Sequence, residues 1–241
     1  MPHRSSTTSS ERSHLDPFVV ATGDASPRDQ RDLMERPFFS LAKSRRVAPI
    51  DFRAGNVTIR VEGTQEHGIA TIWDADVLIW AASQIVEAKD AGLRPSRLMR
   101  ATPYEILRFI GRGTSLNDYQ RLKAALDRLQ STTVATSIRQ PTERRMHRFS
   151  WINEWKERTD RNGKPDGIEL ILPDWFYQAV LDAQNAGFAA AKPGAKFSDV
   201  HAAAIRVIAE RLHGWGLLPE GVDVEATLDP ENGQYHRRWM V

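Results

Sequence analysis

The segment spanning residues 102–123, TPYEILRFIGRGTSLNDYQRLK, constrains the fold more than any other part of the chain. Thr102 and Glu105 have the spacing of a capping box, which predicts the start of a short helix. A Gly-Arg-Gly sequence ends that helix, and Thr114 or Ser115 can cap a second helix running to about residue 130. The segment therefore predicts two helices joined by a tight turn, an arrangement that many DNA-binding proteins use.

The second predicted helix has one apolar face and one polar face. Apolar residues at spacings of three and four predict a buried stripe made of Leu116, Tyr119, Leu122, Leu126 and Leu129. The opposite side carries Asn117, Gln120, Arg121, Ala124 and Arg128. Amide and guanidinium groups hydrogen-bond base edges and phosphates, so this side suits a DNA groove. An ordinary amphipathic surface helix has the same pattern, and the helix alone does not separate the two interpretations.

The residues after this helix predict strands. Residues 131–139 are rich in Thr, Val and Ile, residues 140–146 form a polar tip, and residues 147–155 alternate with aromatic side chains on one face. A third strand is expected at 167–172, which would make the wing a three-stranded sheet. A helix-turn-helix followed by a basic-tipped hairpin is typical of the winged helix. We therefore expect an α+β fold containing a winged helix-turn-helix domain with a β-hairpin wing.

Charge is concentrated in the same region. The chain has a formal net charge of only +2, but residues 94–148 contain 12 basic and four acidic residues. A basic surface of this kind is expected to contact phosphates, although an Arg-rich solvent-exposed face would look the same. The predicted DNA-binding residues are Arg112, Thr114, Ser115, Asn117, Gln120, Arg121, Lys123, Arg128, Arg139, Arg144, Arg145 and Arg148.

Three regions follow from the composition along the chain. Residues 1–36 are polar and weakly patterned, which predicts a disordered N-terminal arm. Residues 37–182 have consistent periodicity and form the predicted winged-helix domain. Residues 183–241 are expected to be a divergent C-terminal segment with one helix at 198–213 and an acidic tail. Other predicted elements are a strand at 56–62, a helix from 74 or 76 to 91 and a short strand at 94–101.

Several classes of protein are disfavoured. The chain has no cysteine, no apolar run long enough to span a bilayer and no signal-peptide core, which indicates a cytoplasmic protein. The histidines never form the closely spaced pair that a metal-dependent nickase needs, and there is no GxxxxGK[ST] phosphate loop. Asp74 and Asp76 are interpreted as partners of a helix dipole. We expect no enzyme activity, no catalytic residue, no cofactor and no metal.

Five stretches of the chain resemble the plasmid replication initiator protein A family. They are residues 37–46, 66–93, 97–139, 144–158 and 167–182, the third beginning RLMRATPYEILRFIGRGTSLNDYQRLK. The resemblance implies a bacterial protein that binds repeated sites in the double-stranded DNA of a replication origin and recruits host replication proteins. It also implies two tandem winged-helix domains, the first of which supports homodimerisation. No membrane partner is implied.

The resemblance ends near residue 182. Residues 183–241 lack the helix-turn-helix and hairpin pattern of a second winged helix. A truncated, rearranged or frame-shifted gene would explain this departure, and so would a genuine one-domain relative. The alternative function is therefore a one-domain dimerisation or regulatory protein, either a repressor or a modulator of a full-length initiator.

Overall fold

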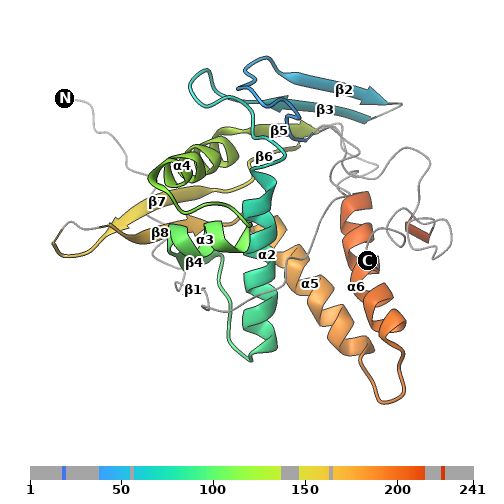
Figure 1. The fold of residues 1–241 in the computed structure, drawn as a ribbon. Helices are drawn as coiled ribbons and strands as arrows, with labels where there is room; N and C mark the ends of the chain where they lie inside the picture. The colour runs from blue at the N-terminus through green and yellow to red at the C-terminus, as the bar shows by residue number, and fades with distance from the viewer. Residues whose placement is uncertain are drawn as a thin grey trace, which may run out of the picture.

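The computed structural model describes residues 18–19, 38–54, 57–136, 147–162, 165–214 and 224–225 of the chain. Within these ranges the chain forms five named helices and two four-stranded sheets (Figure 1). Every named strand pair is antiparallel except one, which is parallel. The expected α+β class is therefore confirmed.

The first sheet has the strand order β1-β4-β8-β7. Its strands are β1 (Phe18–Val19), β4 (Leu98–Ala101), β8 (Pro165–Ile171) and β7 (Glu154–Thr159). β7 and β8 form a hairpin that extends beyond α3 and α4 in Figure 1. β1 pairs with β4 in parallel, so the expectation of a disordered arm is wrong for residues 18–19. The other residues of the predicted arm lie outside the described part of the chain.

The second sheet has the order β2-β3-β5-β6 and lies at the top of Figure 1. Its strands are β2 (Ile50–Ala54), β3 (Val57–Glu62), β5 (Thr133–Thr136) and β6 (His147–Phe149). β3 lies in the center of this sheet and confirms the strand predicted at 56–62. β5 follows directly after the second helix of the helix-turn-helix, so it links that motif to β3.

Local sequence signals predict four of the five named helices. The helices are α2 (Ala75–Asp90), α3 (Pro103–Phe109), α4 (Leu116–Ser131), α5 (Asp174–Ala190) and α6 (Phe197–Gly214), and only α5 was not predicted. The predicted capping box of Thr102 with Glu105 forms, and of the two candidate caps of the second helix it is Ser115 that caps α4, in a second capping box with Asp118. Each hydroxyl accepts a backbone N–H that has no partner within its helix, which stabilises the helix start.

The predicted three-stranded wing sheet is wrong in its third strand. β5 and β6 do form an antiparallel hairpin, but their sheet contains β2 and β3 rather than β8. The stretch 147–155 also divides, because Trp151 and Ile152 leave the strand and are buried in the core. The N–H of Trp151 donates to the carbonyl of Leu129 in α4 instead of to a strand. Burial of one large aromatic residue therefore sends the chain from one sheet into the other.

An aromatic cluster occupies the core beside these sheets. Trp151 stacks on Phe39 at a ring separation of 4.5 Å and makes edge contacts with Phe38, Phe149 and Trp175. Trp151 and Phe38 are fully buried. Such pairs add to the stabilisation from apolar burial, so this cluster holds together segments that are far apart in the sequence.

The C-terminal helices α5 and α6 form an antiparallel pair, and α5 also packs on α2 (Figure 1). Gly187 of α5 faces Ala204 and Val200 of α6, so the two helices approach closely through small side chains. Gln184 of α5 donates to Asp90 of α2 at 2.7 Å. α6 confirms the helix predicted at 198–213. The predicted domain boundary at residue 182 falls inside α5, and the predicted division of the chain into domains stays a prediction.

Candidate nucleic-acid interface

The turn between α3 and α4 is tight and well supported. Gly111 has a φ of 67°, a left-handed conformation that glycine adopts without steric cost. The next amide, that of Arg112, donates to the carbonyl of Leu107 and closes the end of α3. At the start of α4, hydrogen bonds from Ser115 to the carboxylate of Asp118 lower the pKa of Asp118. The positive end of the helix dipole also favours the ionised form of this carboxylate.

The outer face of α4 is exposed along its first two turns. Asn117, Gln120 and Arg121 are all exposed, and the Arg121 side chain is 70% accessible with its nearest carboxylate, Asp118, 3.7 Å away. The buried side of the helix is formed by Leu122, Ala125, Leu126 and Leu129. Leu116 was predicted to belong to that buried stripe, but it is 75% exposed. It is the first residue of α4 and lies beyond the end of the packed interface.

Arg128 occupies a different environment from the one predicted. Its Nε and Nη2 donate to the two carboxylate oxygens of Asp74 at 2.7 and 2.8 Å. The Asp74 side chain is only 2% exposed and also accepts the N–H of Thr71. Hydrogen bonding to Asp74 raises the pKa of Arg128. This bidentate pair joins the last turn of α4 to the start of α2, so the Arg128 guanidinium is already engaged.

Arg112 makes a second connection to the start of α2. Its Nη2 donates to Asp76 at 2.8 Å and to the carbonyl of Trp73 at 2.7 Å. The two acids near the start of α2 are therefore ion-pair partners of the helix-turn-helix. In the part of the chain that the structure describes, no group of three His, Cys, Asp or Glu side chains is arranged to hold a metal ion.

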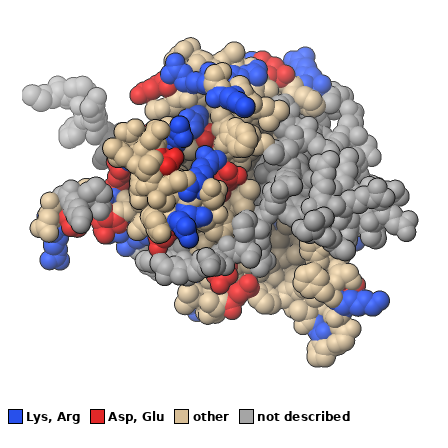
Figure 2. Space-filling model, in the orientation of Figure 1, with Lys and Arg blue, Asp and Glu red and all other residues tan. Residues whose placement is uncertain are grey.

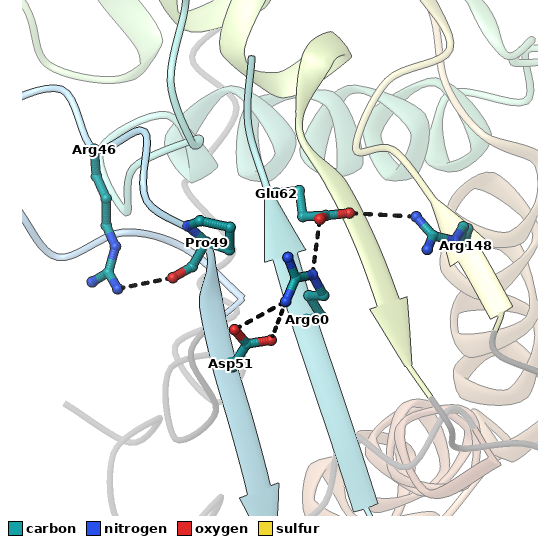
Figure 3. A network of polar contacts seen from close by, with 6 residues as sticks. All are labelled: Arg46, Pro49, Asp51, Arg60, Glu62 and Arg148. Atoms are coloured by element: carbon teal, nitrogen blue, oxygen red, sulfur yellow. Dashed lines mark hydrogen bonds and ion pairs between the residues drawn. The ribbon is translucent and has the colours of Figure 1, made fainter. Parts of the chain in front are cut away.

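Two further basic residues from the predicted set face acids on neighbouring strands. Lys123 pairs with Glu157 of β7 at 2.5 Å, which covers one flank of α4. Arg148 lies 3.4 Å from Glu62, at the end of a charged network across the second sheet (Figure 3). Arg60 links Glu62 to Asp51 in that network and, through a hydrogen bond, lowers the pKa of Glu62.

The basic excess of residues 94–148 is therefore reduced in space by acids from elsewhere in the chain. Arg100 pairs with Glu169 at 2.7 Å, just as Arg128 pairs with Asp74. Figure 2 accordingly shows Lys and Arg over α3 and α4 interspersed with Asp and Glu, with further basic groups along the second sheet. Thr114, Asn117, Gln120 and Arg121 lie together around the start of α4, whereas Arg148 lies on the other sheet.

The remaining predicted residues are not described. Arg139, Arg144 and Arg145 lie outside the described residues, so the contacts of the predicted hairpin tip stay predictions. Sequence reasoning did not propose Arg161, which is exposed in the turn of the β7–β8 hairpin. The Asn-Gly pair at this turn was the available signal. The predicted wing hairpin spans residues 131–155, so Arg161 is not among the predicted residues.

A hollow of about 230 Å³ lies where α2, the turn and α4 meet. Its lining includes the buried Val77, Leu107 and Leu122 together with the more accessible Arg112 and Arg121. The hollow therefore borders the exposed part of α4.

None of the helices that the structure describes is long and apolar enough to cross a membrane.

The family model described as replication initiator protein A matches residues 28–188, more than half of the chain. The chain therefore belongs to the replication initiator protein A family. It is 33% identical over 151 residues to a putative replication protein of Wigglesworthia glossinidia brevipalpis, a match that covers 61% of this chain and 54% of that protein. The chain thus spans about half the length of this relative.

Residues 162–235 also match the model of metallopeptidase family M24. Over 75 residues the chain is 57% identical to Xaa-Pro aminopeptidase 1 of Streptomyces coelicolor. This match covers 31% of this chain but only 14% of the aminopeptidase. The two family matches overlap across residues 162–188, which include β8 and most of α5. The departure noted in the sequence near residue 182 lies within this overlap.

Two solved structures of RctB are among the structural matches. The crystal structure of domains 2 and 3 in selenomethionine form has a TM-score of 0.49 and 14% identity, covering 65% of this chain and 63% of that one. A second structure, of RctB domains 2–3, has a TM-score of 0.46 and 12% identity, covering 76% and 68%.

Proposed function

We propose that this chain is a DNA-binding replication initiator that recognises repeated sites in double-stranded origin DNA. The observation that carries the proposal is the exposed set Asn117, Gln120 and Arg121 on the first turns of α4. These side chains offer amide and guanidinium groups at the end of a helix that follows a tight turn. Membership of the replication initiator family supports the same conclusion.

In this proposal the DNA-binding unit is a winged helix built from α2, β4, α3, α4, β7 and β8. The wing is the β7–β8 hairpin, because β8 also pairs with β4 next to the helix-turn-helix. α4 enters the major groove, and Arg161 in the wing turn contacts a phosphate. Arg112 and Arg128 hold the helix-turn-helix against α2 and thereby set the angle at which α4 is presented.

The proposal extends to partners by family resemblance. The active form is a homodimer on paired DNA sites, and host replication proteins join it at the origin. Its place of action is the bacterial cytoplasm, where plasmid DNA is replicated. The chain acts by binding and requires no catalytic group of its own.

A salt titration tests the DNA contact at the wing. Affinity for duplex DNA should fall with salt concentration because bound phosphates release counterions, with a slope of about −0.9 in log affinity against log salt per contact. Arg161→Ala should make this slope less steep by about 0.9, since one phosphate contact is removed. Fluorescence anisotropy with a labelled duplex measures both slopes.

The matched control for this titration is Arg53→Ala. Arg53 is an exposed arginine on β2 of the other sheet, away from the proposed wing. Its replacement removes the same charge but should leave the slope unchanged. Equal effects of the two substitutions would mean that binding responds only to net charge and that β7–β8 is not the wing.

A second candidate function is supported by the C-terminal segment. Residues 162–235 match a metallopeptidase family model. In this alternative the chain is a one-domain protein that represses its own operon or pairs with full-length initiators and restrains them. The match covers only 14% of the length of the aminopeptidase, so we do not propose peptidase activity for this chain.

Replication in trans separates the two candidates. If the chain is the initiator proposed above, supplying it to a replicon with the cognate origin and no initiator gene should maintain the plasmid, and quantitative PCR should detect stable plasmid copies in transformed cells. If the chain is only a regulator, no stable copies should be found. Supplied beside a full-length initiator, the regulator should lower the plasmid copy number.

A further inference from the structure

Leu116 is an exposed apolar side chain among the polar groups of the proposed recognition face. It is the first residue of α4, follows the N-cap Ser115 and is 75% exposed. Gln120 is one helical turn away on the same side, and Asn117 is the next residue. The buried residues of α4 begin at Leu122, so packing within the described structure does not account for a leucine at position 116.

The neighbours of Leu116 indicate what would cover it. Asn117, Gln120 and Arg121 carry the groups that hydrogen-bond purine edges in the major groove. The apolar group on those base edges is the C5 methyl of thymine, which other proteins contact with aliphatic side chains. An aliphatic residue at the N-terminal end of a helix lying in the groove is within reach of such a methyl.

We propose that Leu116 reads a thymine methyl group in the major groove of the recognised site. This inference rests on the proposed DNA-binding function and names the base feature that one residue of α4 selects. The apolar surface of one methyl group is similar to that of one methylene group. Removing it from water corresponds to about a threefold to fivefold gain in affinity. Leu116 is thus a specificity-determining residue that contributes little to binding of unrelated DNA.

Uracil scanning provides the test. The full chain is first used to select a bound duplex from a random library, and each thymine of that duplex is then replaced singly by deoxyuridine. This exchange removes the methyl and leaves the hydrogen-bonding groups of the base pair unchanged. One replacement in each site should weaken binding threefold to fivefold. In the Leu116→Ala variant, deoxyuridine at that position should no longer weaken binding, while the effects at other positions stay the same. In the Leu116→Met variant, deoxyuridine at that position should still weaken binding to nearly the same extent.

The matched control is Leu93→Ala, which removes an equally large exposed leucine just after α2. It should leave the uracil profile of the wild-type chain unchanged. Urea unfolding midpoints establish that both variants fold, as expected for exposed positions.

Each outcome has a distinct meaning. A library selection that yields no duplex overturns the proposed function itself. A selected duplex whose uracil profile is the same for the wild-type chain and Leu116→Ala overturns only the role of Leu116. If Leu116→Ala instead reduces self-association in sedimentation experiments and leaves the uracil profile unchanged, the leucine belongs to a protein contact and the inference is wrong.

Discussion

Replacing Arg128 by methionine should lower the free energy of unfolding by about 3–5 kcal/mol. The substitution keeps much of the side-chain volume but leaves the Asp74 carboxylate buried without its partner. Asp74 is almost fully buried, and its two oxygens accept charge-assisted hydrogen bonds from Arg128 at 2.7 and 2.8 Å. An ionised carboxylate left in such a site has lost its hydration and receives no compensating charge. Urea denaturation followed by tryptophan fluorescence measures the change.

Two further variants make this result specific. Asp74→Asn combined with Arg128→Met removes the stranded charge, so the double variant should recover part of the lost stability. Arg121→Met changes the same residue type on the same helix, but its side chain is mostly exposed. Its effect should stay within about 0.5 kcal/mol, as is usual for surface substitutions. Similar losses for Arg121→Met and Arg128→Met would show that the Asp74 pair does not stabilise the fold.

Replacing Asn117 or Arg121 by alanine should weaken binding to the cognate duplex by about 1–3 kcal/mol and relax its specificity. Both side chains are exposed on the first turns of α4, so their loss should not change the fold. Direct contacts to base edges discriminate between sequences, whereas phosphate contacts do not. Competition binding with the cognate duplex and a scrambled duplex of equal length separates these contributions.

Gln130→Ala is the matched control for these variants. Gln130 is an exposed amide near the other end of the same helix, away from the proposed base contacts. Its replacement should leave both affinities unchanged. If Asn117→Ala and Arg121→Ala weaken binding to the cognate and scrambled duplexes equally, α4 does not read the base sequence.

Much of the helical structure could be predicted from the sequence because its signals are local. The capping boxes at Thr102 and Ser115 lie within four residues of the helix starts that they define. The periodicity of leucines in α4 predicts its buried side from Leu122 onward. The prediction from periodicity is wrong for Leu116, because a residue at the first position of a helix can lie beyond the surface against which the rest of the helix packs.

The pairing of strands could not be predicted in the same way. The sequence shows where strands occur, but which strands become neighbours depends on contacts between distant residues. Residues 147–155 read as one strand, yet burial of Trp151 divides the stretch between two sheets. Because of this division, the hairpin next to the helix-turn-helix is β7–β8, which is why we propose it as the wing and include Arg161 in the proposed interface.

The sequence by itself determined the helix-turn-helix, its caps and the family to which the chain belongs. Only the tertiary structure decided which arginines remain available to a ligand. Arg121 and Arg128 lie on the same helix and looked equivalent, but Arg128 pairs with the buried Asp74 at the N-cap of α2, whereas Arg121 is mostly exposed beside Asp118. Charge along a chain is additive, whereas ion pairing depends on distances of a few ångströms between groups that folding brings together. The exposed and the half-buried arginines therefore differ only in the folded molecule.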